Sequence, residues 1–411
     1  HVISTGPQAP EDGLSFNGIC AAQPDALALA DTDNDDTAVM IYTAGTTGNP
    51  KGVMLTHYNW HTHVTGYYDL VFLDSWGVSV RGEIREPDGG QAGKEPREGE
   101  VFGVSRDRVS LITLPLFHGY GIFALNLEFL TGGKLVVINR WDPEEAMKSI
   151  ETYRVTDFRG VPTMYIQILN HPSLAKYDLR SLRTCICGAA PMPLAVARAW
   201  KEKFGIDIWE GYGLSEATTV NCGNIAERRP PKYGSIGKCY QKCNAIKIFD
   251  SQNRELPAGQ TGEIVIRGPG VMKGYWNKPV ETAAVIRNGW LHTGDVGRMD
   301  DDGYLYITDR KKDLIIRGGE NIYPKEIENI LYRHPDVLEA GVIGVPDPVY
   351  GESVKAFVAL KTPGSVTEEE LLEFCKKELP SYKRPKAVQF LESLPKSAVG
   401  KILRRELRNI K

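Results

Sequence analysis

The chain has 411 residues, enough for two or three domains, and its 42% hydrophobic and 25% charged residues are typical of a globular protein. The formal net charge of −3 gives no indication of nucleic acid or an acidic membrane surface as the main partner. No apolar run reaches the ~18 residues that a membrane span needs.

The first hundred residues predict one strand, one helix and a surface loop. Residues 1–36 show weak periodicity. Because the chain starts at His1 rather than Met, and no basic and apolar leader follows, we expect a missing or removed N-terminus rather than a secretion signal. "TAVMIYTAG" predicts a short buried strand that runs into a glycine-rich loop. Thr56 is a suitable N-cap for a helix that begins at His57. The charged, turn-rich stretch 81–100 predicts a surface loop.

Strand and helix patterns alternate from residue 108 to 210. Strands are predicted at "RVSLITLPLF", "KLVVI", "VTDFRGV", "LRTCICGAA" and "IDIWEGYG", with helices at "GIFALNLEFLTGG", "DPEEAMKSIETYR", "PTMYIQILNHP" and "PLAVARAWKEKFG". This βαβ rhythm indicates a mostly parallel, doubly wound sheet. Ligands of such sheets lie at the carboxyl ends of the strands, where "GAAP" and "GYGLSE" are found.

The pattern of predicted elements changes after residue 232. Short strands and turns predict a β-rich subdomain over about 232–308, and "DRKKD" (309–313) is a charged, hinge-like joint. The last hundred residues predict an α+β unit, with helices at "EIENILYRHPDV" and "TEEELLEFCKKEL" and strands at "VLEAGVIGV" and "VKAFVAL". The seven cysteines are scattered, which favours a reducing, cytoplasmic setting.

The stretch "YTAGTTGNPKGVMLTH" (42–57) has the composition of an anion-binding loop. It is not a Walker A loop, because Pro50 stands where that motif needs glycine before the lysine. Backbone N–H groups beside glycines, threonine hydroxyls and Lys51 can still surround phosphate oxygens. The alternative is a glycine-rich turn with an incidental lysine.

Four further segments carry candidate chemistry, each with an ordinary structural alternative. In "GYGLSEAT", Tyr212 could stack on a base and Glu216 could hold a magnesium ion. "WLHTGDVG" presents Asp295, expected on a turn, to the hydroxyls of a ribose, and Arg310 of "DRKKDLIIRGGENIYPKEIE" could reach the same ribose. "PKSAVGKILRREL" contains Lys401 directly after Gly400. His57, His61 and His63 have a spacing that suits a metal, but no matching carboxylate or cysteine accompanies them.

Together the five segments resemble the adenylate-forming superfamily of acyl- and aryl-CoA synthetases, luciferases and peptide-synthetase adenylation domains. The resemblance runs from about residue 38 to the end, and the segments follow the family's order. It implies a large N-terminal domain of doubly wound α/β layers plus a β subdomain (1–311), and a small, mobile α+β C-terminal domain (312–411) with its hinge at Lys312. The cofactors implied are ATP, Mg²⁺ and coenzyme A as co-substrate.

The resemblance also implies a role for each matching residue. Thr43, Thr46, Thr47, Gly48 and Lys51 would cradle the β- and γ-phosphates of ATP, and Gly188, Ala189, Ala190, Glu210, Gly211, Tyr212 and Gly213 would form the adenine pocket. Glu216 would bind magnesium with Thr47, and Asp295 and Arg310 would hold the ribose. Lys401 would bridge the acid and the α-phosphate, with His118 beside the acyl pocket and Thr47 as a further catalytic residue. Gly318, Gly319 and Glu320 are the expected CoA-binding residues.

Three features depart from the family pattern. Ala44 replaces a serine or threonine, only 41 residues precede the loop where relatives have a hundred or more, and the stretch 81–100 is long for a connection. If residues of the large domain are missing, the sheet at 108–210 should have an unfilled face or edge.

The function expected is an AMP-forming acyl-CoA synthetase. The segments that would line the acid pocket contain no charge near their centres apart from Arg159, and no aspartate that could pair with an amino acid's ammonium group, so a medium- or long-chain fatty acid is favoured. An aryl-CoA ligase, a module that passes the acyl group to a carrier protein, and a nucleotide-binding remnant without turnover stay open. The expected partners are a small carboxylic acid and CoA, with no nucleic acid, while peripheral membrane contact and a homodimer stay open.

Overall fold

The computed structural model describes residues 2–4, 13–15, 31–44, 50–68, 108–224, 230–240 and 244–410. The chain divides into two compact units, His1–Asp36 and Thr37–Lys411. In the first unit, β1 (Val2–Ser4) and β2 (Gly13–Ser15) form a parallel pair. The remaining elements belong to the second unit, which contains every candidate site residue.

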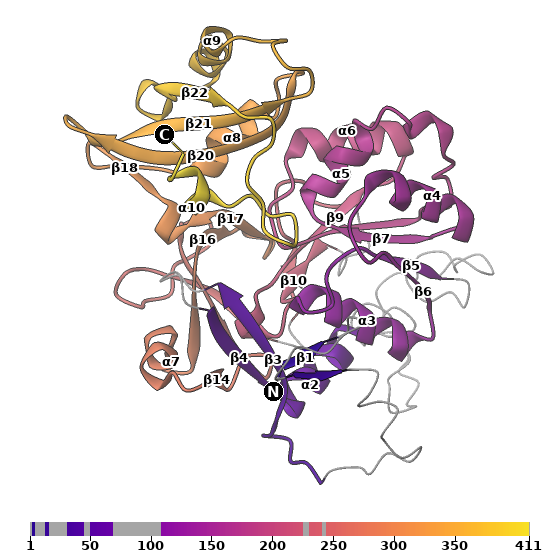
Figure 1. The fold of residues 1–411 in the computed structure, drawn as a ribbon. Coiled ribbons are helices and arrows are strands. Elements are labelled where there is room, and N and C mark those ends of the chain that lie inside the picture. The colour runs from indigo at the N-terminus through magenta and orange to yellow at the C-terminus, as the bar shows by residue number, and fades with distance from the viewer. Residues whose placement is uncertain are drawn as a thin grey trace. The chain divides into compact units, whose positions relative to one another are not determined.

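The central feature of the second unit is a seven-stranded sheet (Figure 1). In spatial order it contains β11 (Lys238–Cys239), β10 (Cys222–Gly223), β9 (Ile208–Tyr212), β8 (Thr184–Cys187), β7 (Asp157–Gly160), β5 (Val109–Ile112) and β6 (Lys134–Val137). The five strands from β9 to β6 run parallel, and β10 and β11 add antiparallel pairs. The expected parallel βαβ sheet is confirmed.

Helices cover both faces of this sheet, as a doubly wound fold requires. On one face lie α4 (Pro143–Tyr153), α5 (Pro162–Leu169) and α6 (Leu194–Phe204), and on the other lie α2 (His57–Tyr68) and α3 (Gly119–Thr131) (Figure 1). The core beneath α4–α6 centres on Phe158, Tyr165 and Trp200, whose rings touch one another. The C-terminal end of α3 agrees with the sequence prediction, because Gly132 terminates the helix in a left-handed conformation with a φ of +69°.

A three-stranded sheet carries the glycine-rich loop. Its strands are β3 (Thr37–Ala44), β4 (Pro50–Thr56) and β14 (Gly274–Tyr275), in the order β14-β4-β3. The expected N-cap is confirmed, because the amide of Asn59 donates to the Thr56 hydroxyl and the Asn59 side chain accepts from the amide of Thr56. The expectation of a buried strand at β3 is wrong. Ile41 is its only buried side chain between residues 37 and 43, since β3 is an edge strand with one neighbour.

Two more sheets follow along the chain. The first contains β12 (Ala245–Phe249), β13 (Gly262–Arg267), β15 (Ile286–Arg287), β16 (Trp290–Met299) and β17 (Leu305–Arg310), with α7 (Pro279–Val285) preceding β15. The second contains β18 (Ile315–Arg317), β19 (Glu320–Ile322), β20 (Val337–Asp347), β21 (Gly351–Leu360) and β22 (Ala387–Phe390), with α8 (Pro324–Leu331), α9 (Glu368–Glu378) and α10 (Arg404–Leu407). A separate apolar core joins α8 and α9 to this second sheet. None of the described helices has the length and apolar character to span a membrane.

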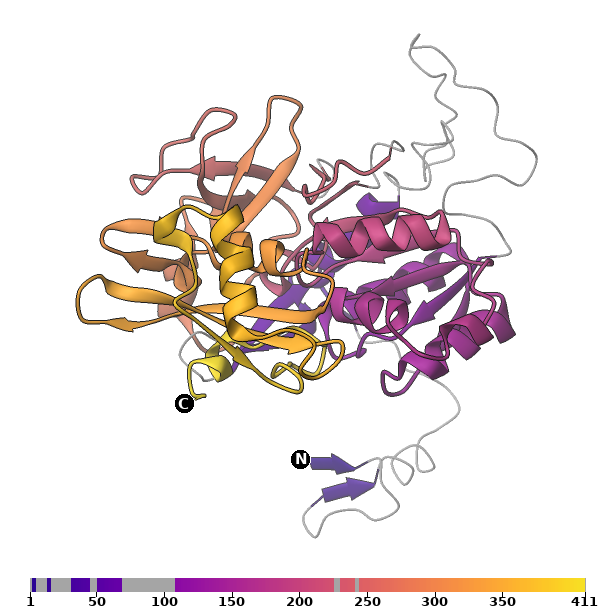
Figure 2. The ribbon, with the colours of Figure 1, turned by 90° about the horizontal axis from the view of Figure 1, so that it is seen from above.

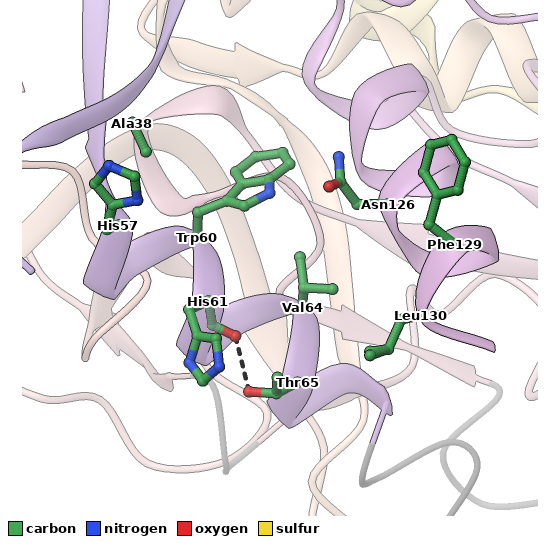
Figure 3. Close-up of a pocket in the computed structure, with 9 residues that line it drawn as sticks. All are labelled: Ala38, His57, Trp60, His61, Val64, Thr65, Asn126, Phe129 and Leu130. Atoms are coloured by element: carbon green, nitrogen blue, oxygen red, sulfur yellow. Dashed lines mark hydrogen bonds between the residues drawn. The ribbon is translucent and has the colours of Figure 1, made fainter. Parts of the chain in front are cut away.

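Apolar side chains are exposed at the β6 edge of the central sheet. Val137 on β6 and Phe129 and Leu130 on α3 are exposed. An open cavity of about 470 Å³ lies between α2 and α3, where Trp60 and Val64 face Asn126 and Leu130 (Figure 3). The expectation that the sheet has an unfilled face or edge stays a prediction. The predicted loop at 81–100 lies outside the described residues.

Candidate active site

The strands on either side of the expected phosphate loop, β3 and β4, pair in register. Thr43 on β3 pairs with Lys51 on β4, so both residues flank the loop between them. Thr46, Thr47 and Gly48 lie outside the described residues. The Nζ of Lys51 lies 4.9 Å from the centre of the Tyr275 ring. The Tyr275 hydroxyl donates to Oε1 of Glu216 over 2.9 Å.

Tyr275 therefore joins Lys51, the lysine expected at the phosphates, to Glu216, the expected metal ligand. Sequence reasoning missed it, because it lies more than two hundred residues beyond the loop, on the short strand β14 that pairs with β4. Glu216 lies in a single 3₁₀ turn, Ser215–Ala217, just after β9. The backbone carbonyl of Glu216 accepts from the amide of Met272, which fixes the turn against the segment before β14.

The residues expected around adenine lie at the ends of neighbouring strands β8 and β9. Gly188 follows β8, and its amide donates to the carbonyl of Gly160. A Cβ at Gly188 would lie 3.0 Å from the Tyr120 ring, so glycine allows α3 to approach closely. Ala189 has a φ of +64°, a strained conformation for an alanine. Ala190 continues this half-buried bend at the carboxyl edge of the sheet.

Glu210, Gly211 and Tyr212 form the end of β9, and Gly213 follows directly. Oε2 of Glu210 accepts from the amide of Met192. Burial raises the pKa of the Glu210 carboxyl to about 7, against the opposing charge of Lys325. The strands β8 and β9 thus bring the whole expected adenine pocket to one edge.

Asp295 links β9 to the β16–β17 sheet. Its Oδ2 accepts from the Tyr212 hydroxyl over 2.7 Å, and its Oδ1 accepts from Nε of Arg310 over 3.0 Å. Arg310 and Asp295 are also register partners on adjacent strands. The expectation that Asp295 lies on a turn is wrong. It is inside β16 and 4% exposed, because the strand continues through Gly294 as far as Met299.

Lys401 approaches the same place from the C-terminal part of the chain. The loop that carries it is held by Thr163, whose hydroxyl donates to the carbonyl of Gly400 over 3.1 Å. Burial lowers the pKa of Lys401 to about 7, and the nearby charge of Arg310 acts in the same direction. Both ribbon views show the yellow C-terminal segment against the magenta strand–helix layer (Figure 1, Figure 2).

His118 is the N-cap of α3. Its Nδ1 accepts from the amide of Tyr120 over 3.2 Å, which leaves Nε2 as the protonated nitrogen of the neutral ring. Burial lowers the pKa of His118, and the charge of Lys401 lowers it further. His118 and Lys401 thus interact electrostatically, although 283 positions of sequence separate residues 118 and 401.

Lys312 lies in the 3₁₀ turn Lys311–Asp313, directly between β17 and β18. Burial and the charge of Arg310 lower its pKa. Gly318 and Gly319 form the turn between β18 and β19, both with positive φ as a tight hairpin turn requires, and Glu320 pairs with Arg317 across it. The structure gives no contact between this turn and the other candidate residues that it describes.

The cavity of Figure 3 is distinct from this site. None of the candidate site residues lines it. His57 and His61 line the cavity, while His63 is buried on the other side of α2 against the carbonyl of Val220. The three histidines thus do not converge, and no cluster of metal-binding side chains occurs among the described residues.

Comparison with known proteins covers almost the whole chain. Residues 1–276 match the family described as AMP-binding enzyme, and residues 326–401 match the AMP-binding enzyme C-terminal domain. A long-chain-fatty-acid–CoA ligase of Bacillus subtilis is 45% identical over 90% of this chain and 61% of the relative. A feruloyl-CoA synthase of an Amycolatopsis species is 39% identical over 91% of this chain and 70% of the relative.

Among solved structures, ATP-bound MatB from Rhodopseudomonas palustris superposes with a TM-score of 0.80 at 32% identity, covering 96% of this chain and 72% of that chain. The chain thus spans about six-tenths to seven-tenths of the length of the proteins that it matches.

Proposed function

Because the chain belongs to the AMP-binding enzyme family, the adenylate-forming superfamily, we propose that it is an ATP-dependent acid–thiol ligase. A carboxylate attacks the α-phosphorus of ATP, and the bond to pyrophosphate breaks. The thiol of coenzyme A then attacks the acyl carbon and AMP leaves. The observation that carries the proposal is the convergence of Lys401, Asp295 and Arg310 at the edge of β9, beside the expected adenine pocket.

We assign the β- and γ-phosphates of ATP to the side of the site that the β3–β4 hairpin forms. Lys51 supplies a positive charge, and Tyr275 holds it next to Glu216. Glu216, oriented by the Tyr275 hydroxyl on its Oε1, would hold the magnesium ion. A carboxylate beside phosphates suits Mg²⁺, and the ion would supply positive charge to offset that of the leaving pyrophosphate.

Lys401 is assigned to the attacking side. A pKa near 7 means that part of the lysine is neutral before substrates arrive. Two anions, the carboxylate and the α-phosphate, raise that pKa and hold the ammonium form. The charged lysine then offsets the repulsion between them in a site with little water. His118, capped onto α3 and neutral, presents Nε2–H beside it.

An apolar acid suits this site better than an amino acid. Arg159, the one charge near the expected pocket, is 3% exposed, and its Nη2 lies 3.8 Å from Glu128, so it is already paired. His118 and Tyr120 add no charge, because burial favours the neutral form of each. We therefore propose a medium- or long-chain fatty acid. An aryl acid is the second candidate, favoured by the likeness to the feruloyl-CoA synthase.

A panel of acids tests the proposal, with AMP release in the presence of ATP, Mg²⁺ and CoA as the measurement. We expect activity with fatty acids of medium or long chain. Exchange of label between ATP and pyrophosphate without CoA isolates the first step, and a phosphopantetheinyl carrier in competition with CoA identifies the acceptor. Lys401→Ala should slow the first step by roughly 10²–10³-fold. If no acid supports exchange between ATP and pyrophosphate, the proposal is wrong, and the protein binds nucleotide without turnover.

A further inference from the structure

Asp309, at the end of β17, has hydrogen bonds at both carboxylate oxygens. Oδ1 accepts from Nη1 of Arg404 over 2.9 Å and from the amide of Arg310 over 2.8 Å. Oδ2 accepts from the amide of Lys325 over 2.9 Å. The side chain is 4% exposed. One buried carboxylate therefore binds a strand that precedes Lys312 to two elements that follow it, α8 and α10 (Figure 1).

The amide of Lys325 has no other natural acceptor. Lys325 is the second residue of α8, and the first amides of a helix have no partner inside the helix. Its Nζ also donates to the carbonyl of Ile307 over 2.9 Å. The start of α8 is thus attached to β17 through both the backbone and the side chain of one lysine.

Arg404 belongs to a larger cluster of charges. Its Nη2 donates to Glu328 over 2.8 Å, and its Nη1 lies 3.3 Å from Asp313. Arg408 donates to Asp313 over 3.2 Å. The cluster therefore contains two arginines and two carboxylates that all follow Lys312, together with Asp309, which precedes it.

We propose that Asp309 is a releasable clasp, a positioning residue that keeps Lys401 at the site during the first half-reaction. The proposal rests on the proposed function, in which Lys401 serves adenylate formation and the second step needs other groups at the same place. With the clasp closed, the loop before α10 keeps the carbonyl of Gly400 hydrogen-bonded to the Thr163 hydroxyl over 3.1 Å, which holds the neighbouring Lys401 at the site.

Release of the clasp leaves both arginines of the cluster paired. If the elements after Lys312 rotate away, Arg404 and Arg408 keep Glu328 and Asp313 as partners, so two positive charges still face two negative ones. Neither arginine is left unpaired in a buried place, which would oppose the motion. Asp309 exchanges the guanidinium of Arg404 and the amide of Lys325 for water, and Nζ of Lys325 exchanges the carbonyl of Ile307 for water.

Hydrogen exchange tests the clasp without any catalysis. The full chain is compared as the parent protein, Arg404→Gln and Arg408→Gln, and exchange of the Lys325 amide is followed by mass spectrometry. Both changes remove one arginine of the cluster, but Arg404 alone contacts Asp309. Asp309, the acceptor of the Lys325 amide, is intact in all three proteins. Peptides from β20 and β21 report whether the C-terminal core stays folded.

We expect the Lys325 amide to exchange roughly tenfold faster or more in Arg404→Gln, because the loss of one charge-assisted hydrogen bond changes an opening equilibrium by about this factor. Arg408→Gln should stay within about twofold of the parent protein. Equal exchange in the two variants, with the β20–β21 peptides still protected, would overturn the clasp.

The half-reactions supply a second readout. Asp309→Asn keeps an acceptor for the Lys325 amide but removes the charge that faces Arg404. Adenylate formation should fall roughly tenfold or more, while thioester formation from synthetic acyl-adenylate and CoA should stay the same or rise. An equal loss in both steps contradicts the proposal. If the parent protein catalyses neither step, the proposed function fails, and the exchange experiment still decides whether Asp309 acts as a clasp.

Discussion

At the scale of single residues, burial decides the chemistry of the site more than sequence spacing does. Glu210 and Lys401 belong to ordinary titratable types, yet burial moves the pKa of each to about 7. A carboxyl and an amine that both titrate near neutrality lie at the edge of β9 and beside it. This makes the protonation state of the site depend on pH in the physiological range.

Glu210 yields a prediction about stability. Its pKa is raised in the folded state, so between about pH 4.5 and 7 the folded chain binds more protons than the unfolded chain, and stability falls as pH rises. Glu210→Gln keeps the acceptor for Met192 and removes this loss. We expect the two proteins to be equally stable near pH 4.5, and the variant to be more stable by roughly 3 kcal/mol above pH 8. Urea unfolding at several pH values measures it, and a difference that does not vary with pH refutes the prediction.

At the scale of elements, the close approach of backbones at the end of β9 explains one glycine of the "GYG" sequence. A Cβ at Gly213 would lie 1.1 Å from the carbonyl oxygen of Thr219, which is backbone and has no freedom to move aside. A Cβ at Gly211 would meet only the carbonyl of Cys222, at 3.4 Å. Two glycines that look alike in the sequence therefore differ in what they tolerate.

Gly213→Ala should cost about 3 kcal/mol or more in the free energy of unfolding, because the strand end must shift away from Thr219. Gly211→Ala, two residues earlier and inside β9, is the matched control and should cost about 1 kcal/mol or less. Urea unfolding of both variants is the measurement. Equal losses in the two variants would mean that the contact with Thr219 does not determine the cost.

At the scale of the whole molecule, the residues of one site come from three parts of the second unit: the β3–β4 hairpin, the central sheet with the β16–β17 strands, and the C-terminal loop of Lys401. The turn at Lys312 joins the last of these to the rest. The turn with Gly318 and Gly319 belongs to that same C-terminal part. The role of Lys312 as a hinge and that of Gly318, Gly319 and Glu320 in CoA binding stay predictions.

Lys312→Pro tests the hinge. Proline fixes φ at position 312 and disfavours the helical conformation of Lys311 before it, so rotation at the joint should be hindered. We expect thioester formation to fall by tenfold or more beyond any loss in adenylate formation. Lys312→Ala removes the same side chain without fixing φ and is the control. The idea fails if the proline variant loses both steps in the same proportion.

The sequence by itself predicted many of the elements and named the candidate residues of the site. Hydrophobic periodicity and the Thr56 cap predicted the strands and helices from 108 to 210 and the start of α2, because these signals are local. Motif order predicted the family. Three facts came only from the tertiary structure: that β3 is an exposed edge strand, that Asp295 lies inside β16, and that Tyr275 connects Lys51 to Glu216. The same holds for Asp309, which the sequence showed only as the first charge of a joint. Strand neighbours, burial and the partners of a carboxylate depend on segments far apart in the chain, and no local pattern of residues encodes them.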